Sequence, residues 1–129
     1  MENKGNQKEN LHPRARKGIL LFNQKKFFEA HEELEIAWRD EENQIRDFYR
    51  GILQVGVAYH HIRRKNFSGA IKLLHRSKKW LEPFPNKCLG VNLKKIKSDS
   101  SKILAKLEKG FFNNATYIDD EIFPNIEFE

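Results

Sequence analysis

The stretch from about Gln44 to Arg64 constrains the fold more than any other part of the chain. Its hydrophobic residues recur with the period of an α-helix and cover most sides of that helix instead of a single stripe. A helix that is apolar on most sides is stable in water only when other elements cover it. The sequence therefore predicts a long central helix that is buried by its neighbours.

Further helices are predicted on both sides of this central segment. Pro13 suits the first position of a helix, and Asn92 suits the N-cap of the last one. Pro83, Pro85 and Gly110 are typical of residues that follow helix ends. The expected helices are 14–22, 27–39, 44–64, 67–81 and 93–109, and the expected buried seam of the fifth is Leu93, Ile96, Ser100, Ile103 and Leu107.

No stretch alternates between apolar and polar residues for long enough to predict a strand, so the fold class is all-α. The segments FFEAHEEL (27–34) and FSGAIKLL (67–74) align at an offset of 40 residues. Each has an alanine three residues after an aromatic residue, which lets paired helices approach closely, as in hairpins of the tetratricopeptide type. We expect a compact bundle of about five helices, formed by two stacked hairpins and a C-terminal helix.

The length and composition indicate one modest domain. The chain has 129 residues, 39% of them hydrophobic, and we expect a disordered segment 1–12, a helical domain 13–110 and an acidic tail 111–129. Cys88 is the single cysteine, so no internal disulfide can form. The N-terminus has no signal-peptide pattern, and no apolar run approaches the roughly 20 residues that span a bilayer. We therefore expect a soluble, cytoplasmic protein.

The charges are unevenly distributed along the chain. Residues 61–110 contain 14 Lys or Arg against 3 Asp or Glu, whereas residues 111–129 contain 5 acidic residues and no basic ones. A basic segment indicates either an anionic partner, such as RNA or DNA, or a lysine face that is only solvated. In the first case, Trp80 or Phe84 could stack on a base. The densest basic group, and hence the nucleic-acid candidate, is Arg63, Arg64, Lys65, Arg76, Lys78 and Lys79.

The segment FFEAHEELEIAW (27–38) places ionisable groups among apolar ones. At about 100° per residue, His31 and Glu35 fall on the same helix face as Phe27, Phe28 and Trp38, whereas Glu33 faces water. The third helix has a similar polar stripe on an apolar background. Because buried ionisable groups are costly unless paired, the two stripes should converge. The predicted buried polar cluster is His31, Glu32, Glu35, Arg50, Gln54 and His61.

This segment and a second one, RGILQVGVAYHHIRRKNFSGAIKLL, also carry a resemblance to a known family. The first contains Phe22, Asn23, Phe28, Glu29, His31, Glu32, Glu35 and Trp38, and the second contains Gly51, Gln54, His60, His61, Asn66, Gly69 and Ala70. In these positions the chain resembles the bacterial and archaeal family catalogued as domain of unknown function 309, over roughly residues 13–108. The resemblance implies a small all-helical domain and no established activity. The lysine-rich fifth helix departs from the family pattern.

Three functions remain open from the sequence. The favoured one is a non-catalytic interaction or scaffold domain with an unknown protein partner and no cofactor. The first alternative is a metal-dependent or acid–base enzyme of hydrolase type that uses His31, Glu35 and His61, although no HExxH motif is present. The second is a nucleic-acid-associated module. An exposed apolar face on the fifth helix would favour a homodimer.

Overall fold

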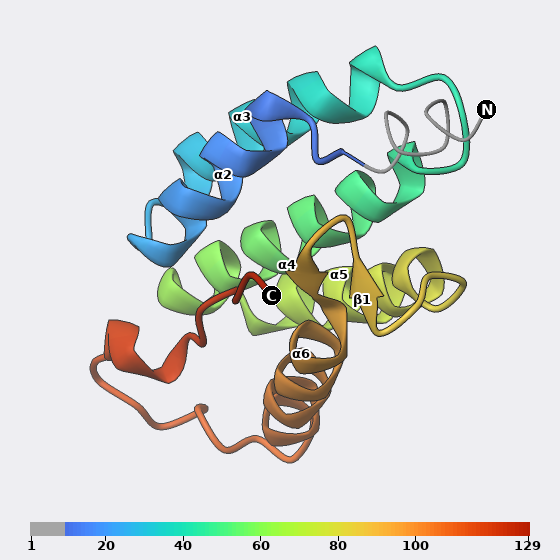
Figure 1. Cartoon of the computed structure of the whole chain (residues 1–129). Coiled ribbons are helices and arrows are strands. Elements are labelled where there is room, and N and C mark those ends of the chain that lie inside the picture. Colours follow the sequence, from blue (N-terminus) through green and yellow to red (C-terminus); the bar gives the residue numbers. More distant parts are fainter. Residues whose placement is uncertain (1–9) are drawn as a thin grey trace, which may run out of the picture.

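The computed structural model describes residues 10–129, and helices dominate this part of the chain (Figure 1). The all-α class and the five expected helices are confirmed, each end within two residues of its predicted position. The elements are α2 (Pro13–Asn23), α3 (Phe27–Asp40), α4 (Arg46–Arg63), α5 (Phe67–Leu81), β1 (Lys87–Cys88), β2 (Val91–Asn92), α6 (Leu93–Glu108) and the 3₁₀ helix η1 (Asp120–Ile122).

Residues 1–9 of the segment expected to be disordered lie outside the described residues. In the rest of that segment, Leu11 is buried and the side chain of His12 accepts a hydrogen bond from the first turn of α2. No helix between residues 10 and 129 is long and apolar enough to cross a membrane. The cytoplasmic location stays a prediction.

Consecutive helices pack as hairpins, as the internal repeat predicts (Figure 1). The turn before α3 and the turn before α5 each place a lysine in the left-handed region, Lys25 at φ 65° and Lys65 at φ 64°. The alanines of the two repeats, Ala30 and Ala70, are 1% and 0% exposed. Small residues at these positions let each helix lie close to its neighbour. Gly18 of α2 acts in the same way, since a Cβ atom there would lie 2.8 Å from Leu34 Cγ.

A short β-hairpin precedes α6 and was not expected from the sequence. Lys87 and Cys88 pair with Asn92 and Val91, and the turn between them has positive φ at Leu89 and Gly90. Two-residue strands are too short to show an alternating pattern. The apolar seam of α6 is buried within the chain as predicted, so this face provides no surface for a dimer.

The C-terminal segment 111–129 folds back onto the helices (orange to red in Figure 1). The side chain of Asn23 donates to Ile126 O at 2.9 Å and accepts from Ile126 N at 2.7 Å. Phe123 is 2% exposed, and its ring lies 5.3 Å from that of Phe27 and 5.2 Å from that of Tyr59. The acidic segment therefore contributes apolar side chains to the core between α3 and α4.

Candidate functional site

The expected buried cluster is corrected by the structure. The side chains of His31 and Glu35 are 32% and 30% exposed, and His31 Nε2 lies 3.8 Å from Glu35 Oε1. Glu35 accepts a hydrogen bond of 2.8 Å from Arg39, and Glu32 is exposed. His61 contacts Asn66 at 3.3 Å between side-chain nitrogens. The prediction that His31 and Glu35 are buried is therefore wrong.

The reason is that α3 packs against α2 on one side and α4 on the other. Its buried stripe is Phe27, Ala30, Leu34 and Ala37, which lies between these two neighbours. The sequence predicts a single inward face with Phe28 in the core, but Phe28 is 58% exposed. It also placed Glu33 in water, whereas Glu33 is 15% exposed and accepts a hydrogen bond of 3.0 Å from Arg14 of α2.

One side of the central helix α4 is only partly covered by the described elements. At about 100° per residue, the partly exposed residues lie within about 60° of Val57, whereas the buried residues of α4 point to the flanks and the opposite side. Each of them is at least partly exposed, and none is acidic. This α4 strip consists of Arg46, Arg50, Leu53, Gln54, Val57, His60, His61 and Arg64.

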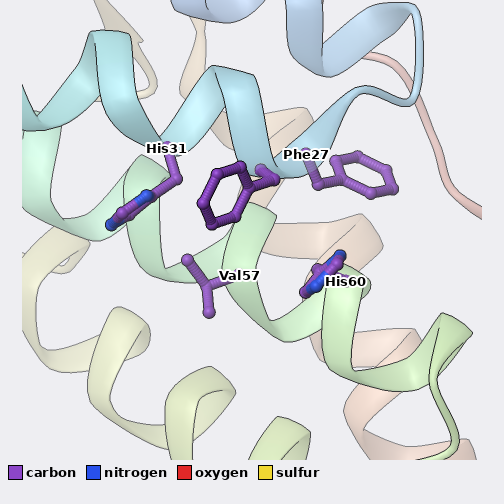
Figure 2. A pocket seen from close by; sticks show the side chains of 5 residues that line it. Phe27, His31, Val57 and His60 are labelled. Carbon is purple, nitrogen blue, oxygen red and sulfur yellow. The ribbon is translucent and has the colours of Figure 1, made fainter.

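A cavity of about 180 Å³ opens beside the middle of the strip, between α3 and α4. Figure 2 shows Phe27 and His31 on α3 and Val57 and His60 on the facing helix α4, which together line this cavity. Phe28 also lines the cavity, with ring centroids 6.0 Å from His31 and 6.4 Å from His60. This α3/α4 pocket has apolar and aromatic walls with imidazole edges, which suits an apolar side chain.

A second cavity of about 380 Å³ adjoins the pocket and shares Phe27, Phe28 and His60 with it. Its other lining residues are mostly basic, namely Lys25, Lys26, Arg63 and Arg64, together with Glu29. Burial lowers the pKa of His60, and the charges of the nearby arginines lower it further. The neutral imidazole is therefore favoured at the junction between the apolar and basic halves.

At the opposite end of the strip, Arg50 is held between two tryptophans. Its guanidinium carbon lies 4.4 Å from the ring of Trp38 on α3 and 4.4 Å from the ring of Trp80 on α5. Arg46 also lies over Trp38, at 5.4 Å. No carboxylate among residues 10–129 forms an ion pair with Arg50.

The residues predicted for nucleic acid are distributed over several surroundings. Arg63 donates to Lys25 O at 2.6 Å and lies 3.7 Å from Asp120, and Lys65 donates to Thr116 O at 3.0 Å. These two cations therefore hold the C-terminal segment. Arg64 lines the basic cavity, and the remaining members, all exposed on α5, are Arg76, Lys78 and Lys79.

The residues predicted as metal ligands do not form a metal site. Within residues 10–129 no three or more His, Cys, Asp or Glu side chains are grouped so that they could hold an ion. His31 and Glu35 neighbour each other on α3, and His61 instead contacts the start of α5. The three side chains therefore do not converge as the metal hypothesis required.

Sequence reasoning missed part of this surface. Lys25, Lys26 and His60 all line the basic cavity, but none of them is among the site residues predicted from the sequence. The signal that was available is the helical position of His60, which is about 60° from Val57 and therefore still at the edge of the strip.

The fold and this surface define a small helical-hairpin domain with a partly exposed basic and aromatic side. Residues 15–73 match the family described as Domain of unknown function (DUF309), so the chain carries a DUF309 domain over α2, α3, α4 and the first half of α5. The matched part is shorter than the resemblance first estimated, and it includes most of the α3/α4 surface. No curated protein matches the chain.

Proposed function

We propose that this protein is a non-catalytic interaction domain that binds a protein partner across the α4 strip and the α3/α4 pocket. The observation that supports this best is the partly exposed side of α4. The central helix of a bundle is normally covered by its neighbours, yet here Leu53 and Val57 are only partly buried and Phe28 is 58% exposed beside them. Apolar surface bordered by polar groups is typical of protein-binding sites.

Two features favour a protein over a nucleic acid as the partner. Arg63 and Lys65 of the predicted basic group already contact the C-terminal segment, through Asp120 and through Thr116 O respectively. Trp80 contacts Arg50 with its ring, and Phe84 packs on Phe48 with centroids 5.8 Å apart, so these aromatics already have partners on the protein. An interface core is apolar and aromatic with arginine, which matches the α4 strip.

Site-specific photo-crosslinking tests the proposal. A photoreactive phenylalanine analogue is placed at Val57, and a matched control places it at Leu20, which is 51% exposed on α2. We expect a discrete crosslinked partner in cells from position 57 and none from position 20. Val57→Glu should remove capture of that partner by the unlabelled protein, while Leu20→Glu should retain it. Equal crosslinking from both positions would contradict the proposal.

A further inference from the structure

Arg50 is positioned as a receptor for an anionic group. Stacking between Trp38 and Trp80 restrains the guanidinium and leaves its N–H groups without a carboxylate partner among residues 10–129. A restrained guanidinium loses less conformational entropy when it binds than a free one does, and its paired N–H groups match a carboxylate. Two stacked indoles also keep part of its surroundings dry, which strengthens charge-assisted hydrogen bonds.

A second observation points to the same place. In the described chain, four buried side-chain nitrogen or oxygen atoms have no hydrogen-bond partner, and three of them surround Arg50. Trp38 Nε1 belongs to one of the stacked indoles, and Arg46 Nε and Gln54 Oε1 lie one helical turn before and after Arg50. Unpartnered buried polar atoms are costly, so a small side-chain movement that lets the N–H groups of Trp38 and Arg46 donate to a bound carboxylate adds affinity, whereas Gln54 Oε1 requires a donor from the ligand.

The distance along α4 relates this receptor to the apolar pocket. Seven residues separate Arg50 from Val57, which is about 10.5 Å along a helix axis. Both side chains lie on the α4 strip, about 20° apart around the helix. A single peptide segment therefore reaches both, with two suitable side chains seven residues apart if it is helical or about three apart if it is extended.

The protein's own acidic C-terminal segment packs against α3 and against the side of α4 that faces away from the strip, through an acidic and an aromatic side chain. Asp120 lies 3.7 Å from Arg63, and Phe123 packs on Phe27, which also lines the α3/α4 pocket. The α4 strip itself has no acidic residue, so it complements an acidic ligand.

We propose that the partner presents an acidic peptide segment, with one carboxylate bound by Arg50 and an apolar side chain about 10 Å away in the α3/α4 pocket. This inference rests on the proposed function and specifies the chemistry of the partner. The indoles hold the guanidinium, the pocket selects an aliphatic or aromatic side chain, and the basic residues at the far end attract further carboxylates.

Selection of random 16-residue displayed peptides on the full-length protein tests this inference. We expect the enriched peptides to share an Asp or Glu at the stated spacing from a large apolar residue. In a synthetic copy of an enriched peptide, replacing that acid by its amide should weaken binding about tenfold or more, measured by fluorescence anisotropy. Arg50→Gln should weaken the acidic peptide similarly and leave the amide peptide unchanged, which identifies the pair.

Matched variants separate the specific pair from general charge. Arg16→Gln removes the same charge from an arginine that also lies over an aromatic ring, at 5.1 Å from Phe128, and should have little effect. Arg50→Lys should recover only part of the affinity because an ammonium group lacks the planar stacked fork. Unchanged thermal melts of each variant show that the fold is intact.

Several outcomes would overturn the inference: no enriched peptide, enrichment without an acidic preference, or equal effects of Arg50→Gln and Arg16→Gln. Tighter binding of a 16-nucleotide oligouridine, lost in Arg50→Gln, would assign the surface to nucleic acid instead. If the crosslinks from position 57 persist while the acid-to-amide change has no effect, the inference fails and the proposed function stands. If the crosslinks are also absent, both fail.

Discussion

Replacement of Phe123 by alanine tests whether the acidic C-terminal segment is part of the folded domain. Phe123 is 2% exposed and is stacked on Tyr59 and edge-on to Phe27. Truncating a buried phenylalanine to alanine costs about 3–5 kcal/mol. We expect about 3 kcal/mol, the lower limit, because a segment without long helices relaxes more easily into the space that is left.

Urea unfolding followed by circular dichroism measures this loss. With an m-value of about 1.5 kcal/mol/M, a loss of 3 kcal/mol lowers the midpoint by about 2 M. Tyr117→Ala is the matched control, because Tyr117 belongs to the same segment but is 75% exposed, and it should change stability by less than about 0.5 kcal/mol. A loss below about 1 kcal/mol for Phe123→Ala would refute the reasoning and leave 111–129 as an independent tail.

Three further predictions follow from individual positions. Gly18→Ala should destabilise the protein by about 1–2 kcal/mol, because the new Cβ atom meets the side chain of Leu34. Gly56→Ala should stabilise it by up to about 1 kcal/mol, because the nearest atom to its new Cβ lies 3.4 Å away on Phe22. Similar melting temperatures for the two variants would contradict this. Burial raises the pKa of Cys88 to about 11. At pH 8 a disulfide reagent should therefore react with the folded protein about 100-fold more slowly than with the urea-unfolded protein. Equal rates would show that the thiol is exposed. Burial lowers the pKa of His60 in the folded protein, so the stability that comes from its neutral imidazole is present above the unfolded pKa of about 6.5 and is lost as the pH falls through the lower folded pKa. His60→Gln should reduce this loss of stability between melts at pH 7.5 and pH 5. An NMR titration midpoint of His60 above 6.5 would contradict the argument.

The position of the α4 strip could be read only in part from the sequence. The polar stripe of the third predicted helix already contained Arg50, Gln54 and His61, since these residues share one side of a helix at about 100° per residue. The sequence predicts that this stripe is buried, because polar residues on a mostly apolar helix usually pair with one another inside the fold. In the structure the stripe is partly exposed, and Arg50 is stacked between indoles instead of paired with a carboxylate.

Local chemistry in the sequence alone determined the helices and the hairpin pairing. Pro13, Asn66 and Asn92 mark helix starts, and the offset of Ala30 and Ala70 marks the close helix contacts; all of these act over a few residues. Only the tertiary structure decided which face of each helix is covered. Because α3 packs on two neighbours, its buried stripe lies between them, so that Glu33 is nearly covered while His31 and Phe28 border an open pocket. That choice depends on contacts between segments far apart in the chain, such as Phe27 with Phe123, which no local pattern records.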